Sequence, residues 1–305
     1  MPTRKGSIHL FQFAGVNVFL HWSWFLVALY EINNRRSQYS SFTWNVLEYL
    51  ALFLIVLLHE FGHSLACRQV GGKADQIVLW PLGGVAYVAP PPRPGATLWS
   101  IAAGPLVNVV LVFILGIVWI MGRAMNWPGA MPNAYAFLKA VSVVNLGLLI
   151  FNMLPIHPLD GGQILRSLLW FVLGRARSLM VTTVVGFGGV ALLIVGAVLA
   201  KDVWLGVLSA FILLNCFGGL LHAHALTRAA NAPRNDRFAC PACNAAPPVG
   251  TFWMCAKCQQ RFDTFAAQAV CPHCGTHFTV TQCLDCGTSR PVSEWAVPPP
   301  IAAKS

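Results

Sequence analysis

The sequence predicts an all-α polytopic membrane protein with about six transmembrane helices, a small membrane-associated β hairpin or sheet, and a small C-terminal β domain of the zinc-ribbon type. Three observations lead to this fold class. Of the 305 residues, 56% are hydrophobic and only 10% are charged, whereas a soluble domain carries about 25% charged residues. The apolar residues gather in runs long enough to cross a bilayer. Eight of the ten cysteines form four CxxC pairs near the C-terminus.

The net charge of +10 has two explanations. Basic residues collect in short cytoplasmic loops of membrane proteins, and they also form nucleic-acid surfaces. We favour the first, because Lys257, Arg261 and Arg290 are too sparse around the cysteine pairs for a phosphate footprint. Nucleic acid is therefore not expected as a partner. The first apolar run has no small-residue cleavage site behind it, so we expect no cleavable signal peptide.

The apolar runs predict six spans, which cover residues 16–30, 46–67, 98–121, 134–153, 179–200 and 204–221. The first of them, Val16–Tyr30, is short for a full crossing. Ser41 or Thr43 can cap the second helix. Between the second and third runs lie two short β-prone stretches, 76–79 and 85–88, among glycines and prolines. They predict a hairpin or small sheet that dips toward the membrane, where it must be covered by protein or line a wet cavity.

A second break interrupts the membrane helices at residues 154–158 (LPIHP). Each proline lacks a backbone donor and disfavours helix in the residue before it. Asp160, Gly161 and Gly162 follow, and then a further helical run over 163–173. A carboxylate at an interrupted membrane helix is costly unless it has a function.

The second span carries the sequence HEFGH at residues 59–63. On a helix, His59 and His63 share one face and can offer two imidazole nitrogens to a zinc ion. Glu60 lies beside the first ligand, where it can act as a general base toward water. Asp160 is the candidate third ligand, and the two glycines after it allow its backbone to approach the metal.

Together these segments resemble the site-2 protease family of intramembrane zinc metalloproteases. The matching motifs, which span about residues 8–222, are LHWSWF at 20–25, HEFGH at 59–63, PLGG at 81–84, GPLVN at 104–108 and NMLPIHPLDGG at 152–162. We find no PDZ insertion, so the chain is similar to the PDZ-less branch. Many members of that branch carry a nucleotide-sensing CBS pair at the C-terminus. Cysteine pairs stand there in this chain, so nucleotide regulation does not carry over.

The resemblance implies hydrolysis of a peptide bond in or near the transmembrane helix of a substrate protein. It also implies a role for Asn152 as a donor to the oxyanion, although a hydrogen bond at the helix break is the alternative. A helical substrate must unwind before attack. We expect the strand that contains Gly83, Gly84 and Val85 to bind it in an extended form by strand addition.

The eight paired cysteines predict two structural Cys₄ zinc sites beside the catalytic zinc. The loops between successive pairs hold eleven, twelve and eight residues. Sequential pairing would give two ribbons and alternate pairing an interleaved module, and the spacing does not decide between them. The cysteines concerned are Cys240, Cys243, Cys255, Cys258, Cys271, Cys274, Cys283 and Cys286.

We expect four segments: a metalloprotease domain over 1–222, a linker over 223–237, the zinc-ribbon module over 238–290 and a disordered tail over 291–305. The basic residues favour a multi-pass protein of the bacterial inner membrane with both termini in the cytoplasm, although Arg35 and Arg36 oppose that orientation. The reduced CxxC pairs agree with a cytoplasmic module. Its expected role is to bind a substrate or a cytoplasmic regulatory protein.

Two other functions remain open at this point. A zinc transporter or sensor would also place histidines in the membrane, but it would tolerate loss of Glu60. A catalytically silent scaffold would act through the zinc ribbons alone.

Overall fold

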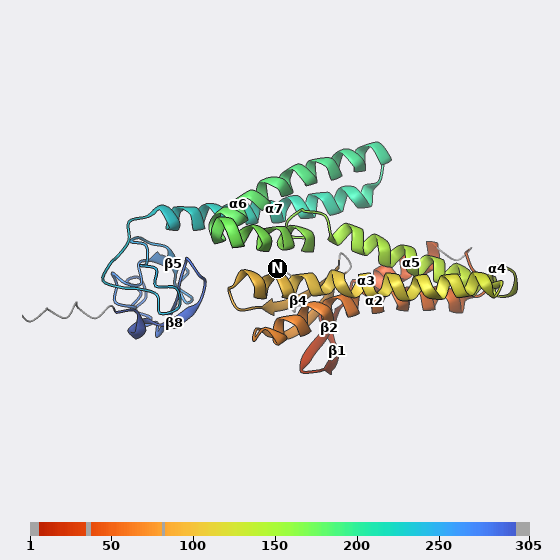
Figure 1. The fold of residues 1–305 in the computed structure, drawn as a ribbon, viewed down its shortest axis with the longest axis horizontal. Helices are drawn as coiled ribbons and strands as arrows, with labels where there is room; N and C mark the ends of the chain where they lie inside the picture. The colour runs from red at the N-terminus through yellow and green to blue at the C-terminus, as the bar shows by residue number, and fades with distance from the viewer. Residues whose placement is uncertain (1–5, 35–37, 81–82, 297–305) are drawn as a thin grey trace, which may run out of the picture.

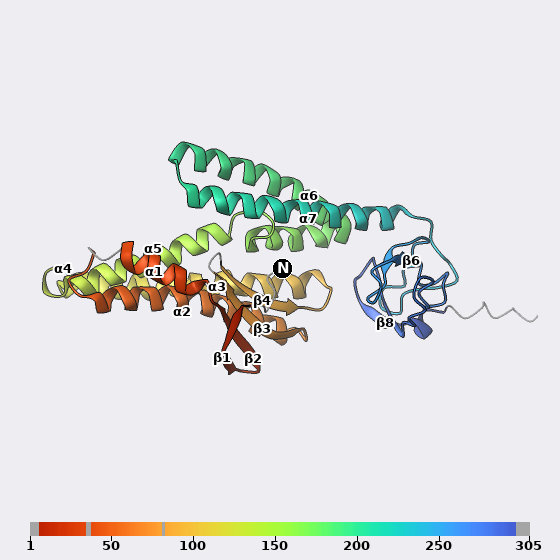
Figure 2. The same ribbon diagram turned by 180° about the vertical axis from the view of Figure 1, so that it is seen from behind.

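Long helices run side by side along the molecule, and the cysteine module lies at one end of them (Figures 1 and 2). The structure is a computed structural model that describes residues 6–34, 38–80 and 83–296. Its helices are α1 Trp24–Asn34, α2 Phe42–Gln69, α3 Pro94–Ala124, α4 Trp127–Ala130, α5 Pro132–Asn152, α6 Asp160–Ala200 and α7 Val203–Asn231. Five of these helices, α2, α3, α5, α6 and α7, are long and apolar enough to cross a membrane.

The first predicted span, Val16–Tyr30, is wrong. Its first half is strand β2 (Val16–His21), and its second half lies in α1, which has only 11 residues. Such a helix is about 16 Å long, roughly half the thickness of the hydrocarbon core. The side chains of Val16 and Val18 are fully buried in a core cluster with residues of α2. These residues therefore form a strand of the sheet, although their apolar composition alone predicts a membrane span.

The predicted small sheet is confirmed, and it has four strands in the order β1-β2-β3-β4. The strands are β1 Ser7–Phe13, β2 Val16–His21, β3 Lys73–Trp80 and β4 Gly83–Ala89. β2 pairs with β3 in parallel, and the other pairs are antiparallel. In this order β4 is an edge strand. β4 also contacts α2, the helix that carries the HEFGH sequence.

The helix boundaries follow the local sequence signals. The hydroxyl of Ser41 accepts a hydrogen bond from the backbone N–H of Thr43 and caps α2, as predicted. The predicted break at 154–158 is confirmed, because α5 ends at Asn152 and α6 begins at Asp160. Gly174 has a φ of 75° inside α6 and kinks that helix. The kink separates the two helical runs that the sequence predicts before and after it.

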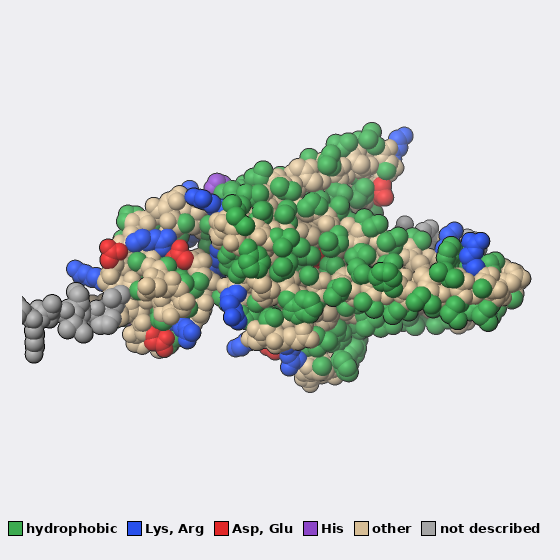
Figure 3. Space-filling view, viewed as in Figure 1, with side chains coloured by type: hydrophobic (Ala, Val, Ile, Leu, Met, Phe, Trp, Pro, Cys, Tyr) green, Lys and Arg blue, Asp and Glu red, His purple; other side chains and the backbone are tan. Residues whose placement is uncertain are grey.

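Apolar side chains cover the long helices on the face shown in Figure 3, and the blue Lys and Arg side chains gather near the ends of those helices. Several of these apolar side chains are almost fully exposed: Val172 is 84% exposed, Leu199 78% and Val203 81%. A surface of this kind is stable against lipid and not against water. The exposed apolar surface therefore agrees with an integral membrane protein.

The C-terminal module consists of two short hairpins, β5 Trp253–Met254 with β6 Arg261–Phe262 and β7 Val280–Gln282 with β8 Ser289–Pro291. A 3₁₀ helix, Val292–Trp295, closes it, and Trp295 is 1% exposed in the core of the module. The module thus continues through Ala296, beyond the expected boundary at residue 290. α7 likewise runs to Asn231, into the expected linker. Residues 297–305 of the expected tail, and Arg35 and Arg36, lie outside the described residues.

Replacing Trp295 with alanine should destabilise the module by about 3–5 kcal/mol, because it removes a large side chain from a small core. Met254→Ala is the matched control, since that side chain is 60% exposed. Pulse proteolysis of the full-length protein in increasing urea measures both free energies of unfolding. Equal stability of the two variants would place Trp295 outside the cooperative unit.

Candidate active site and metal sites

The structure brings together the three predicted catalytic metal ligands, although they lie on two helices far apart in the sequence. His59 and His63 extend from α2, and Asp160 is the first residue of α6. The two Nε2 atoms are 3.1 Å apart. Asp160 Oδ2 is 3.1 Å from His59 Nε2 and 3.4 Å from His63 Nε2. Each of the three residues is less than 10% exposed.

A chain of hydrogen bonds sets which nitrogen of His59 carries its proton. The side-chain amide of Asn145 donates to the backbone carbonyl of Asn108 at 3.0 Å, which fixes how that amide is turned. Its Oδ1 then accepts from Asn108 Nδ2 at 2.8 Å. Asn108 Oδ1 therefore faces His59 Nδ1, at 2.6 Å, and accepts from it. The proton of a neutral His59 is thus on Nδ1, and its Nε2 has a free lone pair.

The same argument holds for His63, whose Nδ1 lies 2.9 Å from the carbonyl oxygen of Ser100. A carbonyl only accepts, so Nδ1 carries the proton. Two imidazole lone pairs and a carboxylate oxygen then converge on one point. Asp160 Oδ2 is buried and makes no hydrogen bond among the described residues. The two Nε2 lone pairs and the Asp160 Oδ2 atom repel one another unless a cation lies between them. Ligands of a tetrahedral zinc ion are about 3.3 Å apart, which fits the three distances.

Helix α3 closes the back of this site at Gly104. A Cβ atom at this position would lie 2.3 Å from His63 Nε2 and 2.9 Å from His59 Nε2. Any side chain there would displace the metal ligands, so the close approach requires glycine. From the sequence, Asn108 stands only as the last residue of the GPLVN motif, and Asn145 has no predicted role. Asparagines inside apolar runs were the signal that could have placed both beside the metal ligands.

Glu60 lies under strand β4. Its Oε2 accepts a 2.8 Å hydrogen bond from the backbone N–H of Ala86. A Cβ atom on Gly84 would be 2.3 Å from the Glu60 Cγ, so the strand passes directly over this side chain. The structure thereby brings the proposed substrate strand, with Gly83 and Val85 beside Gly84, to the proposed general base. Asn152 ends α5 and is half-buried, and its role as an oxyanion donor stays a prediction.

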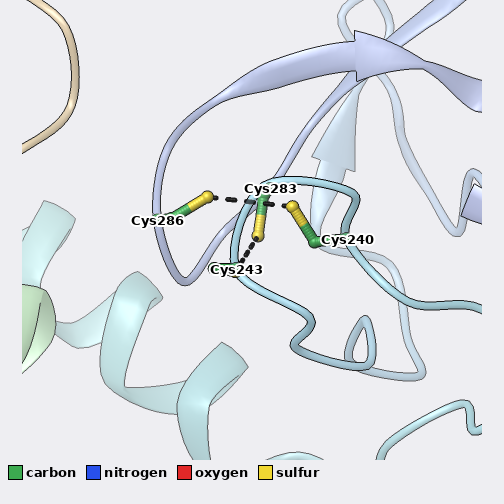
Figure 4. A group of neighbouring side chains, drawn as sticks. All are labelled: Cys240, Cys243, Cys283 and Cys286. Atoms are coloured by element: carbon green, nitrogen blue, oxygen red, sulfur yellow. Dashed lines mark hydrogen bonds between the residues drawn. The ribbon is translucent and has the colours of Figure 1, made fainter. Parts of the chain in front are cut away.

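The eight paired cysteines form two clusters that suit tetrahedral metal (Figure 4 shows one of them). The Sγ–Sγ distances are 3.8 Å for Cys240–Cys286 and for Cys243–Cys283, 3.6 Å for Cys255–Cys274 and 3.7 Å for Cys258–Cys271. All are free thiols. Four sulfurs around a zinc ion at 2.3 Å would be about 3.8 Å apart, whereas a disulfide needs about 2.05 Å.

The pairing of the CxxC units is nested, and neither pairing considered from the sequence is correct. The first unit joins the fourth to form the outer site, and the second joins the third to form the inner site. The chain thus closes on itself, and a hydrogen bond from Ala239 N to the carbonyl oxygen of Trp295, 2.9 Å long, ties its two ends together. Nested pairing produces one module with a single core rather than two independent ribbons.

The third and fourth CxxC units share the sequence C-x-x-C-G-T. The hydroxyl and the backbone N–H of Thr276 lower the pKa of the Cys274 thiol to about 6. Burial acts to raise the pKa of Cys286, but the hydroxyl and backbone N–H of Thr288 outweigh it and lower this pKa to about 7. The lowered pKa of both cysteines favours the thiolate, which is the form that binds metal.

Comparison with known proteins finds a matching family and several similar sequences. The sequence pattern of Peptidase family M50 matches residues 48–132 and 129–196. The chain is 34% identical over 206 residues to the zinc metalloprotease MJ0392 of Methanocaldococcus jannaschii, covering 68% of this chain and 58% of that protein. It is 33% identical over 118 residues to the stage IV sporulation protein FB of Bacillus subtilis, covering 38% of each chain.

A solved structure is similar as well. The site-2 protease from Methanocaldococcus jannaschii superimposes with a TM-score of 0.52 at 30% sequence identity, covering 70% of this chain and 95% of that one. Among the curated relatives, by contrast, the chain spans only about half of each protein, from 38% to 58% of their length.

Gly104→Ala should weaken catalytic metal binding by about 10–100-fold, because its methyl group would push His63 away from the shared metal position. Gly116→Ala is the matched control on the same helix, since a Cβ atom there meets nothing within 4 Å. The protein is first stripped of metal, and its cysteine sites are then refilled. Titration with further zinc measures the affinity of the catalytic site. Equal affinity of the two variants would contradict the close approach of α3.

Proposed function

The chain belongs to the site-2 protease family, Peptidase family M50, and from this membership we propose that it hydrolyses peptide bonds within or near the transmembrane helices of membrane-protein substrates. The observation that carries this proposal is the convergence of His59, His63 and Asp160 beside the carboxylate of Glu60. These three residues would hold one catalytic zinc ion inside the helical domain.

Zinc at this position would polarise a substrate carbonyl and lower the pKa of a bound water toward ~7. Residues of the protein would carry out the proton transfers and orient the metal ligands. Glu60 takes the proton from the attacking water and gives it to the leaving amine. Asn108, Asn145 and the Ser100 carbonyl hold the two imidazoles in the tautomer that binds metal. Asn152 is proposed as a donor to the oxyanion.

The edge strand β4 is suited to hold the substrate extended. The Ala86 N–H donates to Glu60, so we take this residue to direct its backbone groups away from β3, toward the open side of the strand. Gly84 and Val88 have the same orientation, because strand residues alternate. An unwound substrate that pairs with these groups would lie beside Glu60 and the metal ligands. Pairing would also satisfy backbone groups of the substrate that it exposes when its helix unwinds.

We further propose two structural zinc ions in the module, one in each cysteine site, in addition to the catalytic ion. The module is small, so bound metal would supply much of its folding free energy. The basic residues and the reduced thiols favour a cytoplasmic module, cytoplasmic termini and an inner-membrane location.

Glu60→Gln should lower substrate cleavage by about 10²–10⁴-fold while zinc binding is kept, because the amide cannot accept the proton. The measurement compares cells that carry either form together with candidate single-span membrane proteins. A zinc transporter would tolerate the substitution. Equal cleavage by both forms would therefore remove Glu60 from the mechanism and favour the transport function.

Val88→Pro should abolish or strongly reduce cleavage without loss of zinc. Proline is tolerated on an edge strand, but it removes one N–H that the substrate would use. Val88→Ala keeps this donor and is the matched control. Cleavage is measured on one substrate with both variants in lipid nanodiscs. Equal rates would argue against substrate pairing along β4.

A further inference from the structure

The fourth CxxC unit of the module (Cys283–Thr288, here the docking knuckle) packs against the membrane domain. A Cβ atom on Gly287 would lie 2.6 Å from Arg175 Nη1 and 3.0 Å from Pro92 Cβ. Arg175 Nη1 also donates to the carbonyl oxygen of Leu284 at 3.5 Å. Both views of the fold place the module beside the start of α3 and the end of α7 (Figures 1 and 2).

The docking knuckle is held from a second side by the end of α7. Arg234 makes a bidentate ion pair with Asp285, with distances of 2.7 and 3.1 Å. The same guanidinium donates to the carbonyl oxygens of Ala230 and Ala246. Arg234 thus ties the linker to the knuckle. The contact with Arg175 and Pro92 then fixes where the module rests on the membrane domain.

The two contacted residues belong to different halves of the proposed active site. Pro92 lies in the short connection between β4, which covers Glu60, and α3. Arg175 directly follows the kink at Gly174 in α6, and the first part of this helix carries Asp160. The docking knuckle therefore links the end of the proposed substrate strand to the helix that supplies the third metal ligand.

We propose that the docking knuckle is an autoinhibitory clamp. In its docked position it holds the β4–α3 connection against the kink of α6. A substrate that pairs with β4 and continues past Ala89 meets the knuckle at Pro92, so the module must undock before such a segment can be accommodated. Undocking raises the cleavage rate by raising the fraction of molecules that accept substrate. This proposal rests on the proposed protease function.

The module contains its own control for this contact. Gly275 and Gly287 occupy the same place in the two C-x-x-C-G-T units, with φ values of 69° and 80°. An alanine introduces similar backbone strain at either position. A Cβ atom on Gly275, however, meets nothing within 4 Å. The comparison of Gly287→Ala with Gly275→Ala therefore isolates the contact with the membrane domain.

The test uses full-length protein in lipid nanodiscs and two measurements. Hydrogen–deuterium exchange over residues 83–97 and 172–178 reports docking, and the initial rate of substrate cleavage reports inhibition. Gly287→Ala should speed exchange in both segments and raise cleavage about fivefold or more over Gly275→Ala. Arg175→Ala removes the side chain of the membrane domain that contacts the docking knuckle. It should also speed exchange in both segments and raise cleavage, and Arg177→Ala, at an exposed position, is its control.

Two results would overturn the clamp. The first is deuterium exchange in residues 83–97 and 172–178 that is no faster in Gly287→Ala and Arg175→Ala than in their controls. That result would exclude a docking contact that restrains these two segments. Faster exchange with equal or slower cleavage would exclude autoinhibition. Failure of the protease function itself is recognised separately, because Glu60→Gln would then cleave as fast as the wild type.

Discussion

The structure depends on one electrostatic constraint: two imidazole lone pairs and a carboxylate oxygen point at the same place inside an apolar helical domain. The mutual repulsion of these atoms is costly in a medium of low dielectric constant unless a cation compensates it. The distances of 3.1–3.4 Å among His59, His63 and Asp160 are those of ligands around one small ion. Helices α2 and α6 each pack against α3, so metal binding and the position of Asp160 relative to the two histidines are parts of one equilibrium.

The surrounding helices and the sheet hold the three ligand atoms in this position. α3 comes close enough to touch the imidazoles because Gly104 has no side chain. The asparagine pair on α3 and α5 holds one histidine, and a backbone carbonyl of α3 holds the other. The sheet completes the site by laying β4 over Glu60. The break between α5 and α6 lets a carboxylate begin a helix at the depth of the histidines.

Much of this arrangement could be predicted from the sequence. The two histidines, Glu60 and Asp160 stand in short motifs, and apolar length predicts most of the spans. What failed depends on tertiary context. Val16 and Val18 are as apolar as lipid-facing residues, and only the pairing of β2 with β1 and β3 reveals them as a strand. The nested cysteine pairing depends on how the module closes at Trp295, and loop lengths carry no information about that contact.

Zinc K-edge X-ray absorption of the purified full-length protein in nanodiscs tests the metal site most directly. The structure predicts two kinds of scatterer: sulfur at about 2.3 Å from the cysteine sites, and nitrogen and oxygen at about 2.0–2.2 Å from His59, His63 and Asp160. Asp160→Ala should remove the nitrogen and oxygen shell and leave the sulfur shell unchanged. A wild-type spectrum with sulfur alone would contradict a zinc ion at the convergence of the three ligands.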